Sequence, residues 1–227
     1  MHFSPSTQAQ LETLVTIFLE ENAKLNLSAL RTRQSCWAGN VLDSLSLLDW
    51  MDKRGADEQL TLLDVGTGGG FPLLPLAICR PSWQCMGMDA TVKKVEAVGR
   101  IVATLGLGNV SLRTGRAEEL GRDPKLREQF DLVLSRAVAP IATLLEYMSP
   151  FTKVGGAIVL WKSLHIDNEL AAAEKASKLL SCTLREQFVY ALPDDKGERQ
   201  LLIYEKVKPL SLNYPRRVGI PKKAPLS

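Results

Sequence analysis

Hydrophobic residues follow two different spacings along the chain, and the change comes near residue 60. Over residues 4–24, apolar side chains recur every three or four residues, as on the buried face of a helix: Leu11, Leu14, Val15, Phe18 and Leu19. Ser4 and Pro5 are typical of a helix start. A second helix is expected over residues 34–50. Together these segments predict a small N-terminal helical cap, residues 1–55.

After residue 60, short apolar runs alternate with helical segments. Strands are expected over residues 60–65, 85–89, 110–113, 130–135 and 157–161, and helices up to residue 79, over 92–105 and over 168–180. Two last strands, near 184–190 and 200–207, flank the turn-forming residues 193–197. This order predicts an α/β, Rossmann-like domain over residues 56–207. It would have a mainly parallel seven-stranded sheet, helices on both faces and a closing antiparallel hairpin.

The basic charge of the chain is concentrated at its C-terminal end. The 28 basic and 25 acidic residues give a net charge of +3, yet residues 208–227 contain five basic residues and no acidic one, so the remainder carries −2. Four prolines in that stretch disfavour a regular helix or a central strand. A basic, proline-rich tail over residues 208–227 indicates either a local contact with an anion or a solvated end of the chain.

The sequence lacks the patterns of a membrane or exported protein. No apolar run approaches the roughly 18 residues that span a bilayer, and the first residues do not resemble a signal peptide. The cysteines lie far apart, without a Cys-x-x-Cys pair: Cys36, Cys79, Cys85 and Cys182. We therefore expect reduced, mostly buried thiols in a cytoplasmic protein, with no membrane partner and no metal site.

A glycine-rich loop follows the first expected strand, which ends near Asp64. Glycines such as Gly66 and Gly68 let the backbone turn sharply and bring main-chain N–H groups close to a ligand. Asp89 ends the second expected strand, where a carboxylate can accept both hydroxyls of a ribose. These residues predict an adenosine-type cofactor, and either NAD or S-adenosylmethionine would use such an acid.

Two features separate these cofactors. Phe71 stands where the dinucleotide fingerprint G-x-G-x-x-G has its last glycine, which disfavours NAD. The chain also has only two histidines and little length left for a hydride-transfer domain. After the third expected strand, the backbone of Ala117 and the carboxylate of Glu118 could meet an adenine edge, although acids also suit an ordinary helix start.

Several segments together are more specific than any one motif. Residues 64–72, 131–137 and 214–226 resemble those of the bacterial RsmG (GidB) methyltransferases, as do residues 26–31 and 42–48. The resemblance covers nearly the whole chain. It implies S-adenosylmethionine as the cofactor and methylation of N7 of a guanine in 16S ribosomal RNA of the small subunit.

The resemblance also implies site residues. The positions at which the family contacts its cofactor correspond to Gly66, Phe71, Ala117, Glu118 and Arg136. Two departures stand out. Many family members have Arg-His where this chain has Gly39 and Asn40, and many have Gly where it has Leu73.

Methylation at guanine N7 needs few catalytic groups. The nitrogen already presents a lone pair, so no base has to remove a proton before the methyl group is transferred. The fourth expected strand lacks the Asn/Asp-Pro-Pro-Tyr and Pro-Cys motifs of amine and cytosine-C5 methylation, and Arg136 stands there instead. We expect Arg136 to organise cofactor and substrate, because open α/β sheets bind ligands at the carboxyl ends of their strands. A surface arginine at a strand end is the plain alternative.

Basic residues supply the candidate RNA contacts. Lys162, after the fifth expected strand, is a candidate for facing the cleft. In the tail, we expect Arg216, Arg217, Lys222 and Lys223 to contact phosphates, and the two arginines to contribute little to cofactor binding.

Other functions remain alternatives. One is a methyltransferase for a small-molecule or protein substrate, which would give no reason for the basic tail. Another is a non-catalytic RNA-binding assembly factor on the same fold. The intact Gly66 loop, Asp89 and Arg136 argue against a loss of cofactor binding.

Overall fold

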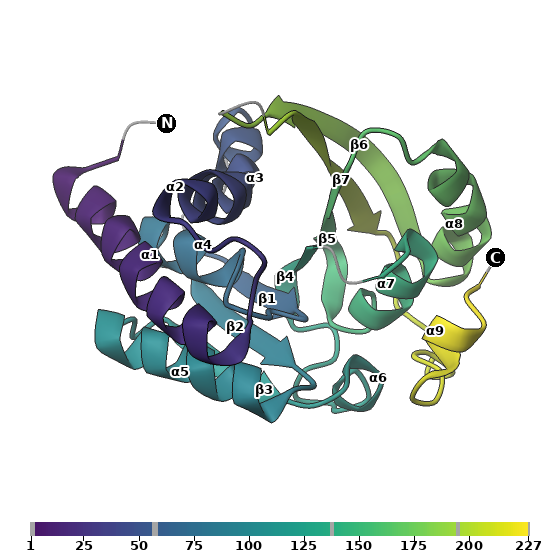
Figure 1. The fold of residues 1–227 in the computed structure, drawn as a ribbon. Coiled ribbons are helices and arrows are strands. Elements are labelled where there is room, and N and C mark those ends of the chain that lie inside the picture. Colours follow the sequence, from purple (N-terminus) through teal and green to yellow (C-terminus); the bar gives the residue numbers. More distant parts are fainter. Residues whose placement is uncertain (1–2, 56–58, 137–138, 194–195, 227) are drawn as a thin grey trace.

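The computed structural model describes residues 3–55, 59–136, 139–193 and 196–226. A twisted sheet runs through the middle of the molecule, with helices on both of its faces (Figure 1). Its strands are β1 (Thr61–Val65), β2 (Gln84–Asp89), β3 (Val110–Thr114), β4 (Phe130–Arg136), β5 (Thr152–Lys162), β6 (Cys182–Ala191) and β7 (Glu198–Lys206).

The strand order explains where a ligand can bind. The sheet runs β3-β2-β1-β4-β5-β7-β6, with β1 to β5 parallel and β7 antiparallel between β5 and β6. The predicted α/β fold with its closing hairpin is therefore confirmed. The chain winds outward from β1 to β3 and then returns to place β4 on the other side of β1. Beyond the carboxyl ends of these strands the connections diverge and leave room for a ligand.

Helices cover the sheet in two sets. One face carries α1 (Pro5–Leu25), α2 (Arg33–Cys36), the π-helix η1 (Trp37–Leu42), α3 (Asp43–Asp52), α4 (Leu73–Cys79) and α5 (Val92–Leu105). The other carries α6 (Ala117–Leu120), α7 (Ile141–Met148), α8 (Asp167–Leu179) and α9 (Ile220–Lys223). The helix α7 was not predicted from the sequence, and residues 34–50 were predicted to form one continuous helix.

Alternating side chains along the strands build two hydrophobic cores. Leu62 of β1 packs in the cluster beneath α1, α3, α4 and α5, whereas its neighbour Leu63 packs in the cluster beneath α7 and α8. Leu132 and Val133 of β4 divide in the same way. This period of two is what a strand buried on both faces requires, because successive side chains point to opposite sides.

The N-terminal helices share the first of these cores. The Ser4 hydroxyl accepts a hydrogen bond from the Thr7 amide (3.1 Å), which caps α1 as predicted. Phe18 of α1 and Val41 of η1 lie in the same cluster as Leu62. The packing is therefore continuous across the predicted domain boundary at residue 55, and that division stays a prediction.

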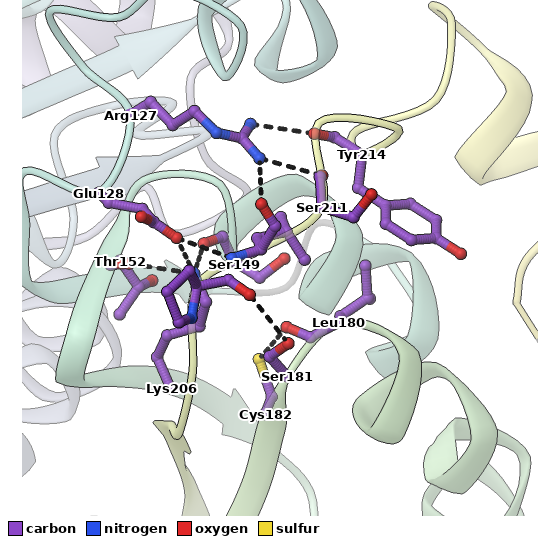
Figure 2. A network of polar contacts seen from close by, with 12 residues as sticks. Arg127, Glu128, Ser149, Thr152, Leu180, Ser181, Cys182, Lys206, Ser211 and Tyr214 are labelled. Carbon is purple, nitrogen blue, oxygen red and sulfur yellow. Dashed lines mark hydrogen bonds and ion pairs between the residues drawn. The ribbon is translucent and has the colours of Figure 1, made fainter.

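The C-terminal segment, residues 208–226, folds back against the body of the molecule. Arg127 donates hydrogen bonds to the main-chain oxygens of Ser211 (3.1 Å) and Tyr214 (2.9 Å), as Figure 2 shows. Beside it, the fully buried Lys206 ammonium pairs with Glu128 (3.0 Å). The same Glu128 carboxylate accepts the amide of Leu210, so the start of the segment is fixed to the sheet. The tail is thus docked rather than a solvated end.

The structure also describes three features on which the sequence led to expectations: the cysteines, membrane-spanning helices and metal-binding groups. The four cysteines are free, and three of them are buried, as expected: Cys36, Cys85 and Cys182. Within the described ranges, no helix combines the length and apolar character that crossing a bilayer requires. Nor do the described residues form a group of three or more His, Cys, Asp or Glu side chains able to hold a metal ion.

Candidate cofactor and substrate site

A cavity of about 380 Å³ opens at the carboxyl ends of β1, β2 and β3. Its lining brings together four residues that the sequence analysis selected from separate segments: Gly66, Asp89, Ala117 and Glu118. Lys94, Arg116 and Tyr147 also line it. These three residues were not predicted from the sequence to belong to the site. Because Tyr147 lies on α7, 30 residues after Ala117, no local motif signals its presence here.

The glycine loop is held against β2. The amides of Gly66 and Thr67 both donate to the main-chain oxygen of Met88, each over 2.9 Å. Gly66 has φ 76°, a left-handed backbone that side-chain-bearing residues rarely adopt, so glycine is required at this turn. Gly68, with φ 57°, then directs its amide at the Asp89 carboxylate (3.1 Å). These contacts fix the loop and place the backbone of Gly66 at the edge of the cavity.

Asp89 is positioned to accept hydrogen bonds from a ligand. One carboxylate oxygen accepts the Gly68 amide, and the other accepts the Thr91 amide (2.9 Å), so the orientation of the side chain is fixed. An ionised carboxylate offers about four acceptor positions. Two are used by these amides, and the others can take the two hydroxyls of a ribose. The cavity therefore fits the adenosine-type cofactor that the sequence predicts.

Glu118 lines another part of the cavity. It is nearly fully buried, and one of its carboxylate oxygens accepts a hydrogen bond from the Gly219 amide (2.9 Å) of the C-terminal segment. Burial, together with the charge of Glu118, raises the pKa of the neighbouring Tyr147 phenol, so the phenol stays protonated at neutral pH. The contact between Glu118 and Gly219 was not foreseen, because the two residues are 101 positions apart.

Asp64 is an unusual buried acid beneath the glycine loop. It is fully buried, and among the residues that the structure describes, neither its carboxylate oxygens nor the Thr67 hydroxyl has a hydrogen-bond partner. Burial raises the pKa of Asp64 to about 7, and the nearby Thr67 side chain, the charge of Arg136 and the Leu73 backbone oppose this only in part. Such orphaned polar atoms are normally satisfied by ordered water or by a ligand.

Arg136 ends β4 and is held on several sides. Its Nη1 donates to Asp43 Oδ2 (3.0 Å) and to the main-chain oxygen of Gly39 (2.9 Å), and its Nη2 donates to Asn40 Oδ1 (2.7 Å). The guanidinium also lies 5.9 Å from the centre of the Phe71 ring. The two residues noted as departures from the family, Gly39 and Asn40, are thus partners of Arg136. Whether Arg136 also contacts cofactor stays a prediction.

Asp43 joins these elements and was missed by the sequence analysis. Its side chain is 1% exposed, and besides Arg136 it accepts a hydrogen bond from the Tyr190 hydroxyl (2.6 Å) of β6. Its main-chain oxygen accepts the indole N–H of Trp161 (2.8 Å) from β5. An acid inside the apolar run of residues 41–48 was the available signal. The cap and three strands therefore meet at one acidic residue.

The candidate RNA-binding residues divide into two groups. Lys162 pairs with Glu169 (2.5 Å), and Arg216 pairs with the fully buried Glu146 (2.6 Å). A phosphate contact by either residue stays a prediction, and each already has an internal partner. The other three lie exposed on the C-terminal segment: Arg217, Lys222 and Lys223.

Comparison with known proteins decides the family. A family model described as GidB, rRNA small subunit methyltransferase G, matches residues 7–202. This chain belongs to the GidB family. A relative from Carboxydothermus hydrogenoformans, named ribosomal RNA small subunit methyltransferase G, is 40% identical over 95% of this chain and 90% of its own length. A relative of the same name from Lachnoclostridium phytofermentans is 39% identical over 96% of this chain and 88% of its own.

Solved structures place the GidB-family chain among methyltransferase folds. A SAM-dependent methyltransferase from Aquifex aeolicus superposes with a TM-score of 0.56 at 17% identity, covering 76% of this chain and 93% of that one. TYW2 of M. jannaschii, solved in complex with AdoMet, gives a TM-score of 0.54 at 16% identity, with 73% and 77% covered. At these identities the likeness shows the fold.

We predict that Asp64 makes the stability of the protein depend on pH. Its carboxyl holds a proton in the folded state up to about pH 7 but loses it near pH 4 when unfolded. The folded state therefore binds more protons in this window, and the free energy of unfolding falls as pH rises through it. Urea titrations from pH 4 to pH 8 should show a decline on the order of 3 kcal/mol. Asp64→Asn should remove most of it, and an equal decline in that variant would contradict the assignment.

We predict that Arg136→Ala destabilises the protein, because it leaves the buried Asp43 carboxylate with only the more distant Arg199 guanidinium (3.9 Å) as a cation. Removing one partner of a buried ion pair costs about 3 kcal/mol or more. The matched control is Arg185→Ala, which breaks an exposed pair with Glu205 and should change the free energy of unfolding by less than about 1 kcal/mol. Urea denaturation measures both variants. Equal, small effects would show that Arg136 is an ordinary surface arginine.

Proposed function

We propose that this GidB-family chain transfers the methyl group of S-adenosylmethionine to N7 of a guanine in 16S ribosomal RNA. The observation that carries the proposal is the match to a family of small-subunit rRNA methyltransferases over nearly the whole chain, together with the adenosine-sized cavity. Asp89, fixed by two backbone amides at the edge of this cavity, is the residue on which cofactor binding depends most.

The residues around the cavity suggest how the cofactor is held. Asp89 accepts the ribose hydroxyls, and the backbone of Gly66 lies against the part of the cofactor next to the glycine loop. Across the cavity, Ala117 and Glu118 contact the adenine edge. S-adenosylmethionine, when bound, supplies an electrophilic methyl group. The chain supplies binding and orientation.

Phe71 and Arg136 organise the side of the site that faces the N-terminal helices. Phe71 packs against Phe18 of α1 with the rings perpendicular and their centres 4.9 Å apart, and the Arg136 guanidinium lies over the Phe71 ring. A guanine N7 attacks without losing a proton, so the requirement is a fixed geometry and tolerance of positive charge on the base. In this proposal Arg136 fixes that geometry, because three hydrogen bonds to η1 and α3 hold its guanidinium in place.

RNA is expected to approach over basic residues near the cavity. Lys94 and Arg116 line its wall, and Arg217, Lys222 and Lys223 are exposed on the C-terminal segment. Cations at such positions neutralise phosphates and release counterions, which gives a salt-dependent affinity. This distribution favours a ribosomal RNA or small-subunit substrate over a small molecule. A ribosomal substrate also agrees with the cytoplasmic location predicted from composition.

Methyl transfer can be measured directly. We expect the purified protein to transfer labelled methyl from S-adenosylmethionine to small-subunit RNA, and nucleoside analysis to yield 7-methylguanosine. Labelled protein or small molecule in place of RNA would favour the alternative methyltransferase. Cofactor binding with no transfer to naked RNA, assembly intermediates or small subunits would favour the non-catalytic assembly factor.

The role of Asp89 has its own test. Asp89→Ala should weaken S-adenosylmethionine binding by about 1 to 3 kcal/mol, the cost of leaving hydrogen-bonding partners unmatched. Calorimetry gives this value, with Asp123→Ala, in the connection between α6 and β4, as a control that removes an equal charge away from the cavity lining. Equal affinities in the wild type and both variants would remove Asp89 from the site.

A further inference from the structure

The C-terminal segment, residues 208–226, contacts both helices that form one wall of the cofactor cavity. Glu118 on α6 and Tyr147 on α7 line this wall. The segment reaches Glu118 through the Gly219 amide (2.9 Å). It reaches Glu146, the residue before Tyr147, through Arg216. Two short helices that carry cavity residues are therefore connected by one strip of chain.

The contact between Arg216 and Glu146 is the strongest of these. Arg216 Nε donates to both carboxylate oxygens (2.9 and 3.1 Å), its Nη2 donates to one of them (2.6 Å), and its main-chain amide donates to the other (2.8 Å). Glu146 is fully buried. Charge-assisted, forked contacts of this kind fix geometry as well as adding energy. Arg216 also donates to the main-chain oxygen of Ala224 (2.9 Å), which closes the segment around α9.

Arginines that follow α6 hold the same segment from the other side. Arg127 Nη1 donates both to the Gly121 oxygen (3.0 Å), just after α6, and to the Tyr214 oxygen (2.9 Å) in the segment. Arg122 donates to the main-chain oxygen of Pro215. A shift of the segment would therefore be transmitted to α6, a four-residue helix with little hold of its own.

Arg217, the next residue, has a different environment. Its side chain is exposed, like those of Lys222 and Lys223 on α9. Neighbouring arginines of equal charge thus face opposite ways: Arg216 toward a buried acid of the protein, and Arg217 toward solvent. The sequence-based expectation treated the two as equivalent RNA contacts.

We propose that Arg216 is a positioning residue for the cofactor cavity, whereas Arg217 serves RNA binding. Through Glu146 and the adjoining contact of Gly219 with Glu118, Arg216 holds α6 and α7 at the separation that the cofactor requires. The role of Arg217 rests on the proposed function. The role of Arg216 requires only that the chain binds S-adenosylmethionine.

Matched single substitutions test this proposal. In calorimetry with S-adenosylmethionine and its demethylated product, Arg216→Ala should raise both Kd values about tenfold, the effect of a displaced cavity wall. Arg217→Ala, which removes the same charge one residue away, should leave them within about twofold. With a small-subunit RNA fragment, Arg217→Ala should lower the affinity and reduce its salt slope by about 0.7 to 0.9. Arg216→Ala should leave that slope unchanged.

Two results would overturn the proposal. One is an unchanged cofactor Kd in Arg216→Ala, whether or not its Tm falls. The other is an equal loss of RNA affinity and salt slope in both variants. If Arg216→Ala does not fold, Arg216→Lys replaces it. A lysine keeps the charge but not the fork, so the cofactor Kd should still rise about threefold. Cofactor binding that follows this pattern without RNA methylation would count against the proposed function and leave the role of Arg216 intact.

Discussion

The buried carboxylate of Asp43 places the strongest constraint on this protein. A charge that is almost without solvent needs a fixed cation and hydrogen-bond donors, and here Arg136 and Tyr190 supply them. Arg136 comes from the end of β4, at the sheet edge where the cofactor cavity opens, and Asp43 begins α3. The ion pair therefore fixes the N-terminal helices to this edge. Phe71, between Arg136 and Phe18, is held by the same arrangement.

A second buried acid does the same for the other end of the chain. Glu146 on α7 binds Arg216, and the C-terminal segment is thereby fixed beside α6. Each terminal region is thus joined to the body of the molecule by a buried carboxylate paired with an arginine, in addition to its other contacts. This arrangement suits a reaction whose nucleophile needs no activating base, since catalysis then depends chiefly on how rigidly the two substrates are placed.

Much of the fold and part of the site could be predicted from local patterns. The spacing of apolar residues located β1 to β5 and α5, because side chains in strands and helices have fixed periods. The glycines after β1 and Asp89 at the end of β2 indicated the edge of the sheet at which a cofactor is proposed to bind, because their function depends on the turn in which each stands. Residues 34–50 were harder to predict: η1 interrupts that helix, and Asn40 of η1 and Asp43 at the start of α3 both contact an arginine of β4.

The sequence by itself determined the succession of strands along the chain, the glycine turn and the acid proposed to bind the ribose, since each follows from residues close together in the chain. Only the tertiary structure decided which charges are buried and with whom they pair. Arg136 meets Asp43 across 93 positions, and Arg216 meets Glu146 across 70. No local pattern distinguishes Arg216 from Arg217. Their roles differ because folding places a desolvated acid within reach of one guanidinium and leaves the other in water.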